Sequence, residues 1–298
     1  MSGALRSAFS HCVQQVRTYD YHHYLCLLEL PVAMRKVAFA LRAFNVETSR
    51  ALDVSTDPRI GLMRLAWWQE AIEKIYSNHL VEHPTAQALA AVLPDAKINK
   101  LWLTRSIQAR IHDAQRESSE MPRNINELEK YAEDTVSTLL YMTLQGGGIV
   151  SAEADHAASH IGKASGIFLL VKSLPYHASR GRLGSYLPLD VAERCGLLVE
   201  EGGRREIRGE FREGLRDVVF EIASAANAHL RKGRELADRV PADARKVLLP
   251  AVAAEILAEN LRRVEFDVFD GRLSRGVFGT PHLWYLWKLK LNSWRGNY

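Results

Sequence analysis

The stretch that decides the fold is residues 37–57, VAFALRAFNVETSRALDVSTD. Its apolar side chains recur at close to helical spacing, which predicts a long and largely buried helix. Pro58 follows directly, and because the residue before a proline avoids helical geometry, Asp57 is expected to lie outside this helix. Polar side chains gather toward the C-terminal end, from Asn45 to Asp53. That end could face a cavity, so the first question is whether it supports chemistry.

Composition narrows the class of protein. The chain has 298 residues, of which 47% are hydrophobic, enough for a substantial core. It carries 39 basic and 35 acidic residues, a net charge of +4 without a dense basic run, which argues against a nucleic-acid-binding surface. The three cysteines, Cys12, Cys26 and Cys195, show no pairing pattern and are expected to be free thiols in a reducing compartment.

The N-terminal segment is open to two interpretations. No apolar run in the sequence approaches the roughly 20 residues of a membrane-spanning helix. The first 19 residues contain Arg6 and Arg17, several serines and no acidic residue, a composition compatible with a mitochondrial targeting helix. The other interpretation is that residues 1–18 form the first structural helix of the domain.

The remaining pattern is helical almost throughout, which predicts an all-α single domain spanning residues 1–298. A charged, poorly periodic segment at 200–212 is expected to be a surface loop. The helices predicted from periodicity cover residues 4–18, 32–53, 60–78, 84–93, 98–118, 124–145, 151–174, 188–195, 213–239, 242–269 and 281–293.

One pair of histidines has the spacing of metal ligands, and a second pair has a different setting. His156 and His160 stand four residues apart on a predicted helix, a spacing that can bind Zn²⁺, but no third ligand is evident, so a structural or surface role is the preferred interpretation. His22 and His23 lie among tyrosines, where packing is the preferred role. The sequence therefore predicts no metal site and no cofactor.

Five segments, taken in order, resemble the squalene/phytoene synthase family over residues 21–269. The resemblance implies an isoprenoid-synthase-type helix barrel around a central cavity. It also implies two aspartate-rich clusters that hold Mg²⁺ and through it two prenyl diphosphates, which the family's enzymes join. The segments are YLCLLELP with FALRAFNVE, IGLMRLAWWQEAIEKIY, YAEDTVSTLLY, HIGKASGIFLLVKSLP, and AHLRKGRELADRVPADARKVLLPAV.

The chain departs from that family where the metal would bind. The first cluster matches Ser49, Arg50 and Asp53, of which only Asp53 is acidic. The second matches residues 176–180, from Tyr176 to Arg180, and contains no acid. Without clustered carboxylates the chain lacks the ligands that Mg²⁺ prefers, and an arginine there repels the ion. Ser137 and Leu140 replace small residues of the family and are expected to narrow the cavity.

This pattern is similar to the family's noncatalytic branch, whose members are mitochondrial assembly factors of respiratory complex I. The resemblance implies a pseudoenzyme that works as a scaffold, with complex I subunits or other assembly factors as partners, located peripherally on the matrix side of the mitochondrial inner membrane. Two alternatives stay open. One is an active, Mg-dependent prenyltransferase that uses Glu47, Asp53 and Asp57; the other is a protein that binds an isoprenoid or lipid without chemistry.

The C-terminal segment 281–298 combines aromatic and basic residues on one predicted helix. Such a combination favours a membrane interface, and the competing interpretation is a helix that packs its aromatics on the barrel. The candidate residues for contact with a membrane or partner are Trp284, Trp287, Lys288, Lys290, Trp294 and Arg295.

Overall fold

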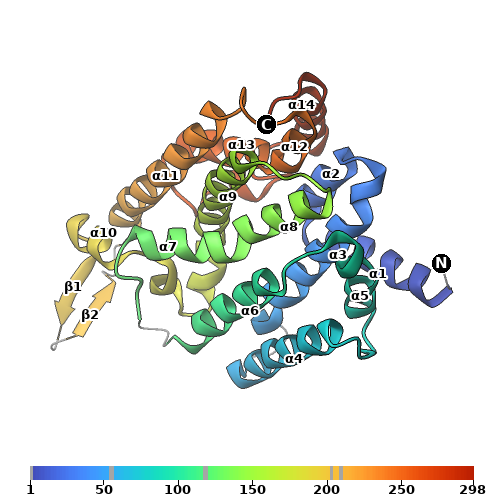
Figure 1. The fold of residues 1–298 in the computed structure, drawn as a ribbon. Helices are drawn as coiled ribbons and strands as arrows, with labels where there is room; N and C mark the ends of the chain where they lie inside the picture. Colours follow the sequence, from blue (N-terminus) through green and yellow to red (C-terminus); the bar gives the residue numbers. More distant parts are fainter. Residues whose placement is uncertain (1–2, 54–56, 117–119, 202–203, 208–210) are drawn as a thin grey trace.

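The computed structural model describes residues 3–53, 57–116, 120–201, 204–207 and 211–298, and the predicted all-α single domain is confirmed (Figure 1). Short helical turns, a π-helical segment and one two-stranded hairpin complete it. The α-helices are α1 (Gly3–Tyr19), α2 (Tyr21–Glu29), α3 (Val32–Ser49), α4 (Pro58–Tyr76), α5 (Pro84–Ala96), α6 (Lys100–Gln115), α7 (Ile125–Ala132), α8 (Thr138–Gly146), α9 (Ala152–Ser179), α10 (Leu189–Arg194), α11 (Arg212–Glu235), α12 (Ala242–Arg245), α13 (Pro250–Arg263) and α14 (His282–Arg295). The shorter elements are η1 (Ala51–Asp53), η2 (Glu133–Ser137), η3 (Leu183–Tyr186), η4 (Lys246–Leu248) and η5 (Gly271–Ser274).

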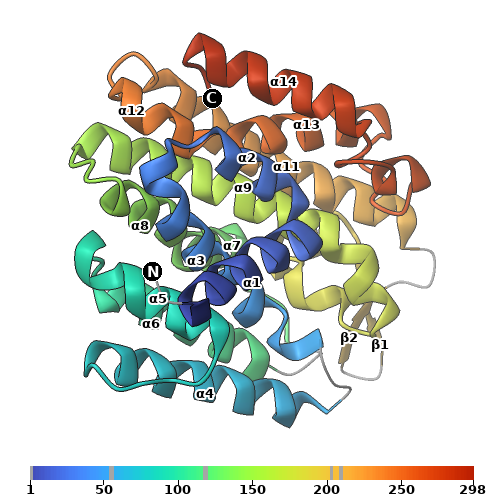
Figure 2. The same cartoon turned by 90° about the vertical axis from the view of Figure 1, so that its right-hand side faces the viewer.

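Helix α9 is the central support of the domain. It runs through the middle of the molecule and packs against α11, α13, α7 and α8 (Figure 1). Its side chains Ile161, Ile167 and Phe168 are at most 1% exposed. In the perpendicular view α14 lies at one end of the stack of helices and α4 at the other, with α3 and α9 between them (Figure 2). Most apolar surface is thus buried between helices, which is the main stabilising term.

The helix boundaries follow from local chemistry. The Asp57 carboxylate accepts a hydrogen bond from the Arg59 amide at 2.9 Å and so caps α4, which begins at Pro58. This confirms that Asp57 lies outside the α3 helix. Ser151 caps α9 in the same way, accepting from the Ala154 amide at 3.2 Å. At the other end of the chain, α14 stops where Gly296 adopts a left-handed φ of 68°.

The predicted helix 124–145 is interrupted. Between α7 and α8 the segment Glu133–Ser137 winds as a π-helix, one residue looser per turn. It lies directly against α9 at Gly162, where an added Cβ would come within 2.5 Å of the Ser137 Cα. The prediction of an uninterrupted helix over residues 124–145 was wrong because the spacing of apolar residues does not reveal one inserted residue.

Other boundaries differ for identifiable reasons. The predicted helix 242–269 is divided by Pro250, which has no amide hydrogen and starts α13 instead. It ends at Arg263, after which Glu265 and Phe266 take positive φ of 53° and 59°. Helix α9 extends to Ser179, beyond the predicted residue 174, because Pro175 is accommodated inside it. Helix α2 was not predicted, since its pattern HHYLCLL is apolar on most sides.

The prediction of a surface loop over residues 200–212 is partly wrong. Strands β1 (Leu198–Glu201) and β2 (Arg204–Ile207) pair antiparallel, with Leu198 opposite Ile207. β-branched and apolar residues at both outer ends favour pairing, and the Gly202–Gly203 sequence is typical of a two-residue hairpin connection. Charged residues dominated the segment and hid this signal, and positions 202, 203 and 208–210 lie outside the described residues.

Helix α1 is an integral part of the domain. Its residues Ala8, Cys12 and Val16 are at most 2% exposed, and the helix packs on α3 and α5. Residues 3–19 therefore contribute to the core. Among the described residues, the structure contains no helix with the length and apolarity needed to cross a bilayer.

Candidate functional site

A cavity of about 630 Å³ opens between α3 and α9 and includes the start of α2 and the loop before α14. Its size lies within the range of small-molecule sites. Polar residues on α3 that line it are Arg42, Asn45 and Ser49. From the loop come Gly276, Val277 and Phe278. The polar end of α3, noted in the sequence, therefore does face a cavity.

The structure brings together the two segments that match the family's aspartate-rich clusters. Tyr176, near the end of α9, donates a hydrogen bond from its hydroxyl to the Asp53 carboxylate at 2.5 Å, across 123 residues of sequence. Burial, and this hydrogen bond to Asp53, raise the pKa of Tyr176 to about 12, so its hydroxyl keeps its proton near neutral pH. The one acid remaining in these motifs is thus engaged by a tyrosine.

The arginines of both motifs are held by aromatic rings. The Arg50 guanidinium lies 3.6 Å from the centre of the Tyr19 ring, and that of Arg180 lies 4.7 Å from the Tyr176 ring. Cation–π contacts of this kind stabilise a cation at a fixed place. A region that holds divalent cations in the family's enzymes therefore presents fixed positive charge in this chain.

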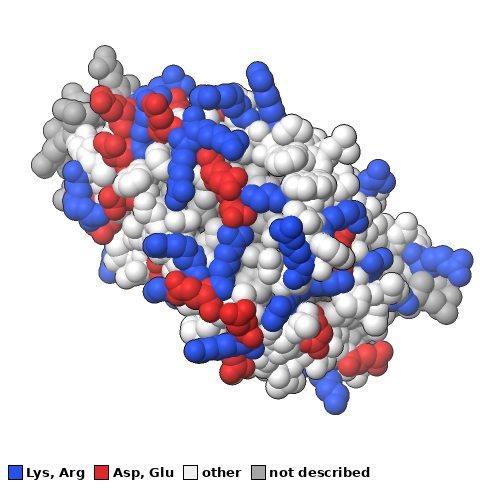
Figure 3. Space-filling view, turned by 90° about the horizontal axis from the view of Figure 1, so that it is seen from above, with Lys and Arg blue, Asp and Glu red and all other residues white. Residues whose placement is uncertain are grey.

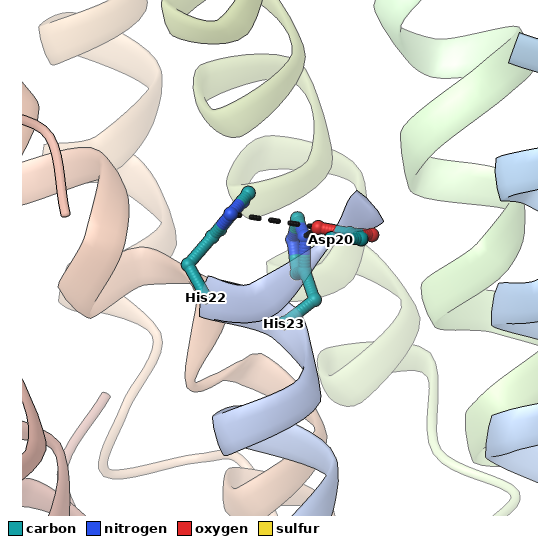
Figure 4. Close-up of side chains that lie close together, drawn as sticks. All are labelled: Asp20, His22 and His23. Atoms are coloured by element: carbon teal, nitrogen blue, oxygen red, sulfur yellow. Dashed lines mark hydrogen bonds and ion pairs between the residues drawn. The ribbon is translucent and has the colours of Figure 1, made fainter. Parts of the chain in front are cut away.

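A second polar cluster lies at the start of α2, where Asp20, His22 and His23 face the cavity (Figure 4). The Asp20 carboxylate is 2.7 Å from His23 Nδ1, 3.5 Å from His22 Nδ1 and 3.5 Å from Arg42 Nε. Burial alone would raise the pKa of Asp20, but the nearby His23 and Arg42 outweigh it and hold the pKa below its usual range. Burial lowers the pKa of both histidines.

This cluster is the only group of the described residues in which three potential ligand atoms converge, all within 4.8 Å. Two imidazoles and a carboxylate suit Zn²⁺ or Fe²⁺. The Asp20 oxygens, however, already bind His23 and Arg42, and Lys172 adds a further positive charge nearby. We therefore interpret the cluster as a hydrogen-bonded ion pair that orients Arg42 rather than as a metal site.

The three carboxylates of the alternative enzyme site do not share one environment. Glu47 faces α1, α4 and α5, with His11 at 3.7 Å, Arg64 at 3.9 Å and His83 at 4.0 Å. Asp57 caps α4. Only Asp53 approaches the cavity, through Tyr176. A relocated magnesium site made of Glu47, Asp53 and Asp57 has no support in this arrangement.

Sequence reasoning missed three cations that line the cavity: Arg42, Arg110 and Lys172. Arg42 offered a signal, since it stands within the apolar run FALRAF, where a charge predicts a buried polar partner. Arg110 and Lys172 gave none, because only the tertiary fold brings them to α3. Ser137 and Leu140 do not line the cavity, so the expectation that they narrow it is wrong: Ser137 instead donates to the Ser159 carbonyl at 3.0 Å.

A second cavity, of about 680 Å³, lies beside α6 and α7 and shares Tyr131 as a wall with the first. Its buried end is an internal network: Tyr186 donates to Asp113 at 2.7 Å, and Arg116 also binds Asp113. Burial and the neighbouring Asp113 raise the pKa of Tyr186 far above its usual value. These groups satisfy one another, so this cavity presents fewer unpaired charges than the first.

The histidine pair with the spacing of metal ligands, His156 and His160, packs against neighbouring side chains. Their rings pack with centroids 5.0 Å apart, and His160 Nδ1 lies 2.8 Å from His229 Nδ1. His229 in turn approaches Glu129 at 3.1 Å. Burial and the neighbouring His229 lower the pKa of His160 to about 4.

The C-terminal helix α14 exposes its three tryptophans and buries Tyr285, which is 0% exposed. Trp284 and Trp287 are 56% and 53% exposed and stack with ring centres 4.7 Å apart, and Trp294 is 81% exposed. The lysines between them are not free: Lys288 lies 3.0 Å from Glu255, and Lys290 lies 3.0 Å from Glu29. Viewed from above, this end of the molecule mixes basic and acidic side chains (Figure 3).

An all-α bundle around a central cavity whose polar end is formed by two facing helices is an isoprenoid-synthase fold. The family model for squalene/phytoene synthase matches residues 16–278, and the chain belongs to that family. Solved structures agree on the fold. A squalene synthase, HpnC, from Alicyclobacillus acidocaldarius superposes with a TM-score of 0.73 at 18% identity, covering 90% of this chain and 97% of that one. A ligand-bound dehydrosqualene synthase gives 0.77 at 16% identity, covering 96% of each chain.

Within the family, the chain is similar to proteins named NADH dehydrogenase (ubiquinone) complex I, assembly factor 6. The human protein is 38% identical over 97% of this chain and 82% of its own length. The rat protein shows the same identity and coverage. The Drosophila melanogaster homolog is 41% identical over 86% of this chain and 76% of its own length.

Proposed function

We propose that this chain is a noncatalytic member of the squalene/phytoene synthase family that serves as an assembly factor for respiratory complex I, NADH:ubiquinone oxidoreductase. Its similarity to proteins of that name along nearly the whole chain carries the proposal. Its proposed partners are complex I subunits or other assembly factors, and its proposed place is the matrix side of the mitochondrial inner membrane, held there peripherally. It requires no metal and no cofactor for this work.

The noncatalytic part of the proposal is supported by the ends of α3 and α9. A prenyl synthase needs Mg²⁺ to neutralise and ionise a diphosphate. Here the family's metal-binding positions offer one carboxylate, Asp53, bound by Tyr176, beside the cations Arg50 and Arg180. We propose that Ser49, Arg50 and Asp53 are the remnant of the family's first aspartate-rich cluster. Tyr176 and Arg180 are the proposed remnant of the second cluster.

A turnover assay tests this part. The purified chain, given Mg²⁺ and farnesyl or geranylgeranyl diphosphate, is expected to release no more diphosphate than a protein-free blank. Asp53→Ala is expected to match the wild type. Turnover that exceeds the blank and disappears in Asp53→Ala would show an active prenyltransferase instead.

We further propose that α14 is the surface that docks on a polypeptide partner. Exposed, stacked tryptophans are typical anchors of protein–protein interfaces. Because Lys288 and Lys290 are paired with glutamates, and the surrounding face mixes both signs of charge, the surface lacks the dense positive charge that anionic lipids attract (Figure 3). Arg295 and Trp294 extend the same exposed face.

The double variant Trp284→Ser/Trp287→Ser tests this surface in cells that depend on the protein. We expect it to fold with an unchanged melting temperature, because both side chains are exposed, but to support at least about tenfold less complex I. The matched control is Met63→Ser/Leu80→Ser, whose side chains are 70% and 79% exposed but lie outside α14. Wild-type binding to phosphatidylcholine–cardiolipin vesicles that the double variant loses would identify a membrane as the occupant instead.

A further inference from the structure

Three histidines from two neighbouring helices form a cluster: His156 and His160 on α9, and His229 on α11. The ring centres of His156 and His160 are 5.0 Å apart, and so are those of His160 and His229. The two helices pack along each other (Figure 1). In the sequence only the first two imidazoles stood near each other. The fold supplies the third from a position 69 residues beyond His160.

The spacing of the two helices is fixed at Gly233, one turn after His229 on α11. A Cβ added at Gly233 would lie 2.6 Å from the Ile161 Cδ1 atom and 3.5 Å from the His160 Cβ atom. Ile161 is itself 0% exposed, so this contact belongs to the core. The close packing of α9 on α11 therefore holds the side chains of His160 and His229 opposite each other.

The hydrogen bonds of His229 determine which of its nitrogens is available. Its Nε2 lies 3.1 Å from the Glu129 carboxylate on α7, which can only accept, so Nε2 carries a proton. In the neutral ring Nδ1 is then bare, and it lies 2.8 Å from the Nδ1 of His160. One proton, on His160 Nδ1, joins the two rings. Two imidazole nitrogens thus point at one place, where a cation can replace that proton.

Near neutral pH few protons compete for His160. Burial, followed by the nearby His229 and His156, lowers the pKa of His160 to about 4. Lys163 and Lys232 act in the same direction, and Lys163 is itself paired with Glu133 at 3.7 Å. A metal ion must displace protons from its histidine ligands, so an imidazole that is already neutral favours binding.

The geometry suits Zn²⁺ after a small adjustment. Two Zn–N bonds at a tetrahedral angle place the nitrogens roughly 3.4 Å apart, about 0.6 Å wider than the present Nδ1 pair. His156 stands one turn before His160 on the same face of α9, and its exposure allows the change of rotamer that brings it to the same ion. Glu129 occupies the place of the carboxylate that commonly accepts a hydrogen bond from the second nitrogen of a zinc-bound histidine.

We propose that His156, His160 and His229 bind a Zn²⁺ ion, and that Glu129 holds His229 in the tautomer that the ion requires. Imidazole ligands suit Zn²⁺, whereas Mg²⁺ prefers oxygen ligands, so this site differs in chemistry from the magnesium sites of the family. The ion links α9 to α11 and, through Glu129, to α7. The inference goes beyond the proposed function and does not depend on it.

Calorimetric titration of the full chain with ZnCl₂ at neutral pH, after treatment with EDTA and desalting, tests the proposal. We expect one zinc ion per chain, unaffected by excess Mg²⁺. His156→Gln, His160→Gln and His229→Gln are each expected to weaken binding at least about tenfold, and Glu129→Gln about tenfold. His156→Gln is the most informative variant, because an exposed side chain is removed and the melting temperature should not change. His79→Gln, an exposed histidine that follows α4, is the matched control and should change affinity less than about twofold.

Four outcomes would overturn the proposal. An absence of saturable Zn²⁺ binding would leave His160 and His229 joined by a shared proton only. Unchanged affinity in the His156→Gln protein would show that the third ligand does not bind. Binding that is lost in His22→Gln but kept in His156→Gln would place the ion in the cluster of Asp20, His22 and His23. A thiolate-to-metal charge-transfer band in the Co²⁺-loaded protein would place it at a cysteine.

Discussion

Gly162→Ala is expected to lower the free energy of unfolding by about 3 kcal/mol, because the close contact of α9 with the π-helical segment leaves no room for a methyl group. An added Cβ would lie 2.5 Å from the Ser137 Cα and 2.7 Å from its amide nitrogen. Both are backbone atoms, so a side-chain rotation cannot relieve the clash. In a chain of this size the melting temperature should fall by roughly 5–10 °C, measured by circular dichroism.

Gly3→Ala is the control for this experiment. Gly3 begins α1, and an added Cβ there would meet no atom within 4 Å. Alanine has the higher helix propensity, so the control should be neutral or slightly stabilising. A Gly162→Ala protein as stable as the control would mean that α9 and the segment Glu133–Ser137 are not packed as described.

Acidification from pH 7 to pH 4.5 is expected to destabilise the fold by on the order of 3 kcal/mol. Burial, followed by the nearby Arg182, lowers the pKa of His177 to about 4, and burial with His229 does the same for His160. Both are partly exposed, so each contributes less than its full shift. The unfolded chain takes up protons below about pH 6.5, whereas the folded chain resists them, so stability is lost as the pH falls through this window.

Urea unfolding measured at several pH values checks this. His177→Gln should make stability fall less steeply between pH 6.5 and 4.5, because the group that protonates in the unfolded chain is gone. His79→Gln, at an exposed position, should keep the wild-type slope. Stability that stays flat across this range in the wild type would contradict the buried, neutral state of these imidazoles.

The fold was largely predictable because its signals are local or belong to the family. Helical periodicity defined most helices, and Pro58 placed the break after Asp57, which caps α4. Two features could not be predicted. The π-helical segment Glu133–Ser137 has the same apolar pattern as an α-helix. In the hairpin at Leu198–Ile207, the many charged residues obscured the strand pattern.

The site was predictable only where residue identity mattered. Comparison with the family singled out Asp53, Arg50 and Tyr176, but not the hydrogen bond that joins Tyr176 to Asp53 across 123 residues. The convergence of Arg110 and Lys172 on the cavity arises from the packing of α6 and α9 around α3, which no local pattern encodes. A list of changed residues therefore does not show what the changed site can bind, because that depends on tertiary contacts of this kind.

The central claim is that the chain supports complex I assembly without the chemistry of its family. Its most direct measurement is the amount of complex I, resolved on native gels, in cells that lack the protein and are rescued with the wild type or with Asp53→Ala. The account predicts equal restoration by both. A well-folded Asp53→Ala protein that fails to restore complex I would contradict it, because the last motif carboxylate would then be required for function.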